Sequence, residues 1–297
     1  MPSDEYLAFV AAAAARPVPP PPADMAEQRS RIDAAMSQIP LAPGIEAVPF
    51  VRGGVPGTEC RPIDGGDDLP IVLWFHGGGF RIASSLAYRA FSSHVATAFG
   101  ARVLVPDYRL APEYRFPAAV DDCWAVWESL LAEGLDTSRV VVAGDSAGGG
   151  LAASITLRAL ADGVLPAGTI CLSPWVDLTV SSTTYDTRAS VDTMFSRQSA
   201  AEAVTAYLAE HDPRDPIASP VFGDWTGAPP LQIICGDAEV LLDDAHLLHD
   251  TAQDVGVDVT ISVYPEMPHI FPFNHPAFPE ATEGLHEMAS FFRRVIG

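Results

Sequence analysis

Short apolar runs alternate with helical segments along this chain from about residue 70 onward. The runs are rich in β-branched residues and lack the polar alternation of half-exposed strands, which predicts strands buried on both faces of a sheet. They cover residues 71–75, 102–106, 139–143, 169–173, 231–235 and 259–264. The segments between them have helical spacing and end at glycine, a common helix stop. This alternation predicts βαβ units, and hence an α/β fold with a doubly wound, mostly parallel sheet flanked by helices.

Two stretches fall outside this pattern. Residues 1–45 are helical and rich in proline, and residues 180–215 contain a polar loop followed by a helical segment. We expect both to pack over the carboxyl ends of the strands, where open α/β sheets bind ligands. The predicted organisation is a cap segment at residues 1–45 and a main domain at residues 46–297, with residues 180–215 contributing to the cap.

The charge balance excludes some classes of partner. The chain of 297 residues has 38 acidic and 17 basic residues, a net charge of −21. Nucleic acid and anionic membrane surfaces would both be repelled, so we expect neither as a partner. No apolar run approaches the roughly 20 residues that cross a bilayer. Asp4 and Glu5 precede the apolar stretch 8–15, where a secretory signal would carry positive charge, so we expect a cytoplasmic protein.

The cysteines give no sign of a metal site. Cys60, Cys123, Cys171 and Cys235 lie far apart, and the sequence has no CxxC pair or cysteine–histidine cluster. Zinc sites need such closely spaced ligands. We therefore predict no metal, and we expect the last three cysteines to pack as small buried thiols.

A G-x-S-x-G motif lies between a predicted strand and a predicted helix, at residues 144–148. This is the context of a nucleophile elbow, in which a tight turn exposes the serine at the start of a helix. The partial positive charge there favours an oxyanion. The alternatives are a phosphate-binding loop or a plain tight turn. Because the chain contains no lysine for a phosphate loop, we predict Ser146 as a nucleophile.

The segment HGGGF at residues 76–80 directly follows the first predicted buried strand. Consecutive glycines let the backbone approach a substrate and direct several amides to one point, as an oxyanion hole requires. The predicted donors are the N–H groups of Gly78, Gly79 and Ala147. We expect His76 to shape this loop by hydrogen bonding rather than to act as a base.

His269 lies on the loop after the last predicted strand. The other histidines lie on apparent helices or in polar loops, where packing or solvent exposure is the default. In α/β-hydrolases the chain order is nucleophile, acid, base, and this order selects His269 as the base. The acid should then lie after the strand at 231–235, where residues 237–245 read DAEVLLDDA.

The acidic segment offers several carboxylates. Asp237 follows the strand too closely, and Asp243 and Asp244 lie where the next helix begins, a position at which acids cap free N–H groups. Glu239 and Asp243 remain as the contenders for the acid that orients His269.

Together these motifs closely resemble the hormone-sensitive-lipase-like family of esterases, the bacterial family IV carboxylesterases with the GDSAG form of the serine motif. The resemblance covers nearly the whole chain and rests on HGGGF, DYRLAPEYRFPAAVDD (107–122), GDSAGGG, SPWVDL (173–178), GDAEVLLDD and PHIF. It implies an α/β-hydrolase fold with a helical cap and a triad of serine, acid and histidine. It also implies no metal or organic cofactor and a preference for esters of short to medium acyl chains.

Relatives in this family typically show D-P-L-x-D at the acidic segment, with the first acid catalytic. Aligning the last acid with Asp243 sets Glu239 at the catalytic position, so the resemblance implies the triad Ser146, Glu239 and His269. The expected partner is a small-molecule ester, with a homodimer as one possible assembly. Two alternatives are a lactone hydrolase with the same triad and a non-catalytic small-molecule receptor; such receptors resemble this family but lack the base histidine.

Overall fold

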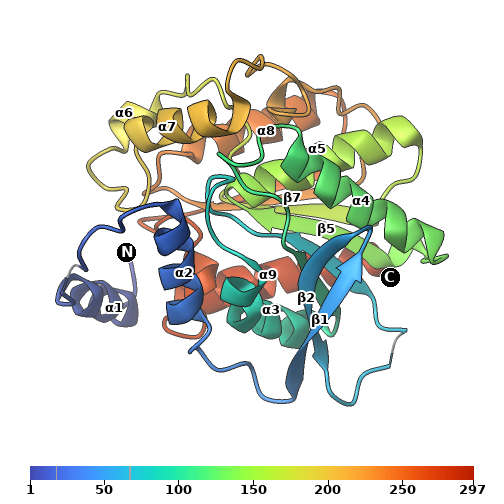
Figure 1. Cartoon of the computed structure of the whole chain (residues 1–297), viewed down its shortest axis with the longest axis horizontal. Coiled ribbons are helices and arrows are strands. Elements are labelled where there is room, and N and C mark those ends of the chain that lie inside the picture. Colours follow the sequence, from blue (N-terminus) through green and yellow to red (C-terminus); the bar gives the residue numbers. More distant parts are fainter. Residues whose placement is uncertain (18, 67) are drawn as a thin grey trace.

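A central sheet organises the molecule (Figure 1). The computed structural model describes residues 1–17, 19–66 and 68–297. Within these ranges, eight strands form one sheet in the order β1-β2-β4-β3-β5-β6-β7-β8. Their bounds are β1 Ile45–Arg52, β2 Val55–Pro62, β3 Ile71–Phe75, β4 Arg102–Pro106, β5 Val140–Asp145, β6 Gly168–Leu172, β7 Leu231–Gly236 and β8 Val259–Tyr264.

The predicted parallel core of the sheet is confirmed. All neighbouring pairs from β4 through β8 are parallel, and these strands match the six apolar runs to within a residue or two at each end. The prediction that the strands are buried on both faces is confirmed for β3 to β7. It is wrong for β8, whose side chains are mostly half-buried. The reason is that β8 is an edge strand, with a neighbour on one side only.

The sequence pattern did not predict β1 and β2. They form an antiparallel hairpin at the other edge of the sheet, and β2 also pairs antiparallel with β4. Pro49 and Pro56 lie within these strands, and side chains of both strands are partly exposed. The edge strand β1 tolerates Pro49 because one of its sides needs no ladder hydrogen bond, and Pro56 precedes the residues of β2, 57–60, that pair with β4.

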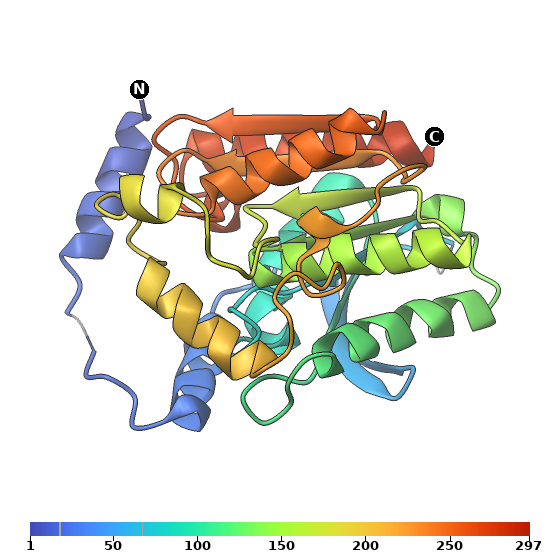
Figure 2. The same cartoon turned by 90° about the horizontal axis from the view of Figure 1, so that it is seen from above.

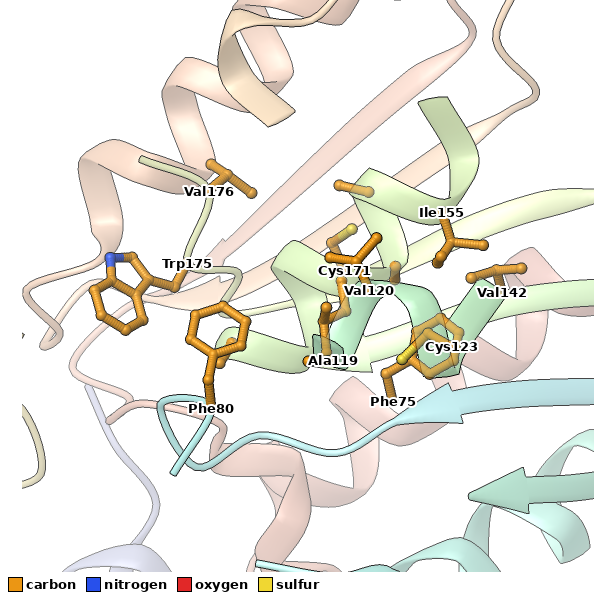
Figure 3. Packing of buried hydrophobic residues seen from close by; sticks show 14 of the residues in the cluster. Phe75, Phe80, Ala119, Val120, Cys123, Val142, Ile155, Cys171, Trp175 and Val176 are labelled. Carbon is orange, nitrogen blue, oxygen red and sulfur yellow. The ribbon is translucent and has the colours of Figure 1, made fainter. Parts of the chain in front are cut away.

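Helices cover both faces of the sheet. Along β3, Ile71, Leu73 and Phe75 join a core with α4 (Ala118–Ala132), α5 (Ala147–Asp162) and α8 (Leu242–Asp254). Figure 3 shows part of this core, in which Phe75 and Val142 lie near Cys123 and Ile155. Val72 and Trp74 point to the opposite face, where α3 (Ser85–Phe99) and α9 (Pro279–Ile296) pack. The alternation follows from the two-residue period of a strand.

The remaining helices gather at one end of the sheet, the end toward which the arrows of the parallel strands point (Figure 2). They are α1 (Asp4–Ala14), α2 (Met25–Met36), α6 (Thr184–Thr187) and α7 (Arg197–Leu208). Three short 3₁₀ turns, η1 (Thr137–Arg139), η2 (Pro220–Phe222) and η3 (Phe271–Asn274), also occur within the described ranges.

The four cysteines are all buried free thiols, as expected for the three that lie in or next to apolar runs. Across the part of the chain that the structure describes, no helix has the length and apolar character needed to cross a membrane.

Candidate active site

The turn between β5 and α5 holds Ser146 in an unusual backbone conformation. Its φ is 53° and its ψ is −123°, a region that residues with a Cβ rarely adopt. The flanking glycines explain how the turn fits. A Cβ on Gly144 would lie 2.1 Å from the carbonyl oxygen of Gly148, and a Cβ on Gly148 would lie 2.0 Å from that of Phe75. The turn therefore requires glycine on both sides of the serine, as the motif predicts.

Ser146 opens onto a cavity of about 480 Å³, a size typical of small-molecule sites. His269, Gly78 and Gly79 line the same cavity. Its other walls are mostly apolar and include Ile32, Met36, Ile82, Met194, Phe195, Ile270 and Phe273. The structure thus brings the predicted serine, histidine and two glycines to one place. Among the described residues, no cluster of histidine, cysteine and carboxylate side chains is arranged to hold a metal ion.

His269 is paired with Glu239. The distance from Nδ1 of His269 to Oε2 of Glu239 is 2.5 Å, and both side chains are buried. With the Nδ1 proton donated to the carboxylate, Nε2 is left free to accept a proton. Within the described residues no hydrogen bond joins His269 to Ser146; in ligand-free enzymes such bonds are often long.

The pKa of His269 is raised above the usual value for histidine. Burial by itself lowers this pKa, because it disfavours the charged imidazolium. The charge and hydrogen bond of Glu239 act in the opposite direction, and Asp192 and Asp145 add to their effect. The imidazolium is thus stabilised by its acidic surroundings.

The other carboxylates of the acidic segment contact backbone and hydroxyl groups away from the histidine. Asp237 accepts a hydrogen bond from the N–H of Glu266. Asp243 accepts from the N–H groups of Thr183 and Thr184, at 2.9 and 3.1 Å. The expectation that Asp243 caps its own helix was therefore wrong: it lies in the first turn of α8 but satisfies the free N–H groups of α6.

Asp244 is fully buried and does not cap α8. It accepts hydrogen bonds from the N–H groups of Val176 and Asp177, at 3.1 and 3.0 Å, and from the hydroxyl of Ser182. Burial raises its pKa to about 7, although these hydrogen bonds oppose the shift. Asp244 therefore fixes the loop after β6 to the start of α8.

Ser173 is a site residue that sequence reasoning did not single out. Its hydroxyl donates to Oε1 of Glu239 at 2.9 Å, and it accepts a hydrogen bond from the N–H of Ile270 at 3.0 Å. The N–H of Gly236 also donates to Oε1 of Glu239, at 2.8 Å. One carboxylate oxygen is thus held by the protein, which leaves the other for His269. The quoted segment SPWVDL contains Ser173 but gives no sign of this contact.

Asp192 is a second residue that the sequence did not indicate. One carboxylate oxygen accepts from the N–H of Val240, and the other accepts from the N–H groups of Met194 and Phe195, all at 2.8 Å. Asp192 thereby ties a wall of the cavity to the residue next to Glu239.

The glycine loop after β3 carries two of the predicted oxyanion donors, Gly78 and Gly79. Gly78 and Gly79 have φ values of 109° and 59°, which favour glycine. The carbonyl of Gly78 accepts from the N–H groups of Arg81 and Ile82, which fixes the turn. Within the described chain, the N–H groups of Gly78 and Gly79 form no hydrogen bond with protein atoms. Ala147 follows Ser146 as the first residue of α5, where the N–H has no partner within the helix.

His76 supports this loop by hydrogen bonding, in agreement with the prediction. Its ring is fully buried, lies 4.2 Å from the ring of Tyr108 in a stacked arrangement, and donates from Nδ1 to the carbonyl of Gly77. The hydroxyl of Tyr108 donates to the carbonyl of His76. Burial lowers the pKa of His76, so the ring is held neutral.

Asp145 connects the glycine loop to the serine turn. Its carboxylate accepts from Nε1 of Trp74 and from the hydroxyl of Tyr88, and that hydroxyl accepts from the N–H of Gly77. Burial raises the pKa of Asp145 to about 6, although both side-chain hydrogen bonds oppose the shift. This network sets the glycine loop and Ser146 at a fixed separation.

Comparisons with known proteins identify the family of the fold. Residues 72–273 match a family described by the alpha/beta hydrolase fold. An acetyl-hydrolase from Streptomyces hygroscopicus is 41% identical over 228 residues, which cover 76% of each chain. An esterase from Acinetobacter venetianus is 31% identical over 265 residues, covering 89% of this chain and 87% of that protein.

A solved structure is similar over the whole length. It is a crystal structure of an esterase from the bacterial hormone-sensitive lipase family, with a TM-score of 0.92 and 35% identity. The alignment covers 100% of both chains.

Proposed function

Because the chain belongs to the hormone-sensitive-lipase-like family of carboxylic ester hydrolases, we propose that it cleaves its ester through an acyl-enzyme formed on Ser146. His269 acts as the base and Glu239 as the acid that orients it. The observation that carries this proposal is the pairing of His269 with Glu239 beside the cavity that contains Ser146 on its strained turn.

In the proposed mechanism, Nε2 of His269 takes the proton of the Ser146 hydroxyl as its oxygen attacks the ester carbonyl. The resulting imidazolium is stabilised by Glu239 and then protonates the departing alcohol. A water molecule, activated by the same histidine, attacks the acyl-enzyme and releases the carboxylic acid. Ser146 regains its proton, so the cycle closes.

The N–H groups of Gly78, Gly79 and Ala147 hold the oxyanion of both tetrahedral intermediates. Support comes from the free amides of the glycine loop and from the position of Ala147 at the start of α5. Loss of one such donor costs on the order of 3 kcal/mol of activation free energy.

We propose a preference for short to medium acyl chains. The apolar walls and the volume of about 480 Å³ suit such substrates. The similarity to an acetyl-hydrolase points in the same direction. A lactone would meet the same three residues, so lactones belong in any substrate panel.

Residues 1–45 and 180–215 are proposed to form the cap of this site. From the first segment, Gln28, Ile32 and Met36 on α2 line the cavity. From the second, Met194 and Phe195 line it. The ring of Phe195 is stacked 6.4 Å from the ring of His269.

Substitution Ser146→Ala tests the proposed nucleophile. The variant should fold like the wild type, as judged by circular dichroism, and should lose hydrolysis of p-nitrophenyl butyrate. More than a few per cent of the wild-type kcat, in a preparation free of other esterases, would refute the assignment. Wild-type rates on p-nitrophenyl esters from acetate to palmitate, measured beside several lactones, then define the substrate class.

A further inference from the structure

The active-site cavity is lined in part by polar side chains that the proposed mechanism does not use. Arg81 and Gln28 both line the cavity, among apolar neighbours such as Ile32 and Ile82. Mostly apolar pockets use a few such polar groups to select their ligands. These two polar groups should therefore help to determine which substrates the cavity binds.

A hydrogen-bonded anchor joins the segments that carry Gln28 and Arg81. Arg29, next to Gln28 on α2, donates from Nε to the carbonyl of Arg81 at 2.7 Å. It also donates from its guanidinium to the carbonyl of Ala111, at 2.7 Å. One turn further along α2, Asp33 accepts a hydrogen bond of 2.6 Å from the hydroxyl of Ser84. The first turns of α2 are thus fixed against the loop that bears Arg81.

Across the described residues, neither the guanidinium of Arg81 nor the amide of Gln28 forms a hydrogen bond or ion pair. Glu202 acts on Arg81 only as a more distant charge, and its carboxylate accepts instead from Nε2 of Gln198. Partial burial lowers the pKa of Arg81, because it disfavours the cation.

A carboxylate matches these donors better than a neutral group does. The planar guanidinium presents paired N–H groups that bind both oxygens of a carboxylate, and the amide of Gln28 offers a further donor. Such a charge-assisted contact would also offset the cost of holding Arg81 partly out of water.

We propose that this cavity recognises esters that carry a carboxylate, bound by Arg81 and Gln28, in addition to the ester group. The proposal rests on the proposed function, because the ester must react at Ser146. Arg81 follows the oxyanion glycines closely, and its N–H donates to the carbonyl of Gly78. The carboxylate should therefore lie several bonds from the scissile carbonyl.

The net charge of −21 repels an anionic ester as it approaches the protein. The experiment must therefore distinguish the contact of the substrate carboxylate with Arg81 and Gln28 from this general repulsion. At physiological salt, charges are screened over about 8 Å, and the contact in the cavity acts within that distance. Rates should be compared at one fixed salt concentration, with a control that removes an arginine elsewhere.

Two pairs of substrates isolate the carboxylate. In the first pair, the mono-p-nitrophenyl ester of adipic acid is compared with p-nitrophenyl hexanoate, so that a methyl group replaces a carboxylate in the acyl part. In the second, 4-acetoxybenzoate is compared with 4-methylphenyl acetate, which makes the same replacement in the alcohol part. The measured quantity is the ratio of kcat/KM for the anionic ester to that for its neutral partner, after subtraction of the uncatalysed rate.

Arg81→Met should lower this ratio by at least about fivefold in one of the pairs, and Gln28→Leu should lower it less. Arg115→Met is the matched control, because Arg115 is exposed, does not line the cavity, and its loss changes the net charge equally. The proposal is overturned if Arg81→Met lowers the ratio by less than about fivefold in both pairs. It is also overturned if Arg115→Met lowers the ratio as much as Arg81→Met does. Should Arg81→Met fail to fold, Arg81→Gln replaces it under the same criterion. Hydrolysis of p-nitrophenyl hexanoate by the wild type and its loss in Ser146→Ala test the proposed function separately.

Discussion

The hydroxyl of Ser173 donates a hydrogen bond of 2.9 Å to Oε1 of Glu239, the carboxylate oxygen that does not contact His269. Ser173 directly follows β6 and has a positive φ of 44°. The same hydroxyl accepts from the N–H of Ile270, the residue after the histidine. One side chain therefore joins the loops that carry the proposed acid and the proposed base.

Ser173→Ala should lower kcat on p-nitrophenyl butyrate by roughly 10- to 100-fold, because a lost hydrogen bond to a charged group costs about 1.5–3 kcal/mol. Since Ser173 does not contact the substrate in this scheme, KM should change little. Ser92→Ala is the matched control: Ser92 is also buried, and its hydroxyl has no hydrogen-bond partner among the described residues. Equal losses of kcat in both variants would show that Ser173 has only a structural role.

Glu239→Gln should reduce kcat by a factor of roughly 10³ or more, because an amide can favour the wrong tautomer of His269. Asp243→Asn should instead lower the free energy of unfolding, by on the order of 1 kcal/mol, since Asp243 caps α6. Rates on p-nitrophenyl butyrate and urea unfolding curves separate the two effects. The reverse ranking of the variants in kcat would assign the acid role to Asp243.

The pH dependence of His269 provides an independent check. Its pKa is raised, so the ring stays protonated to a higher pH than a free imidazole. Only the neutral ring can accept the serine proton, so activity should fall as the pH drops through a value above 6.5. NMR titration of His269 in the Ser146→Ala background should give this midpoint, and adding Glu239→Gln should lower it. An unchanged midpoint would mean that Glu239 does not set the charge of His269.

The sequence predicts the parts of the site that follow local rules. Ser146 and the glycines around it were predicted because a nucleophile elbow needs small flanking residues and a strand before a helix. Glu239 was predicted from the resemblance, since nothing local distinguishes it from its neighbours. Its pairing with His269 in the structure is consistent with that alignment, whereas its role stays a proposal.

The residues that the sequence did not predict depend on contacts between distant segments. Ser173 is 66 residues from Glu239, and Asp192 is 48 residues from Val240. The β1–β2 hairpin was missed for a different reason: partly exposed strands that contain proline lack the apolar run that marks a buried strand. Arg81 gives no signal in the sequence, because only the fold shows that it faces the cavity.

Removal of part of the N-terminal segment should separate the contributions of its two helices. Deleting residues 1–40 removes α2 with Gln28, Ile32 and Met36, and should lower kcat and alter the preference for acyl length. Deleting residues 1–20 removes only α1, whose Tyr6 and Phe9 pack on Phe278 away from the cavity, and should have a smaller effect on rates. Circular dichroism tests whether both variants remain folded. Wild-type rates and chain-length preference in a folded 41–297 variant would contradict the proposed cap.

A cluster of three histidines outside the active site should make the fold sensitive to acid. His94 on α3, His275 after η3 and His286 on α9 meet, with ring centroids 4.9 Å apart for His94 and His275 and 6.4 Å apart for His275 and His286. Burial lowers the pKa of His94. Burial, and then repulsion from the other two rings, lowers the pKa of His275.

A folded-state pKa below the unfolded value means that the unfolded chain binds protons more readily. The stability that the rings of His94 and His275 provide when neutral is therefore present above about pH 6.5 and is lost as the pH falls below it. His275→Gln should narrow the difference in Tm between pH 7.5 and pH 5.5, by on the order of 1 °C because the rings are partly exposed. His246→Gln, at an exposed position of α8 outside the cluster, is the control. Buried acids such as Asp145 and Asp244 titrate in all three proteins, so they cancel from the comparison. An unaltered difference in Tm for His275→Gln would show that the cluster does not determine acid sensitivity.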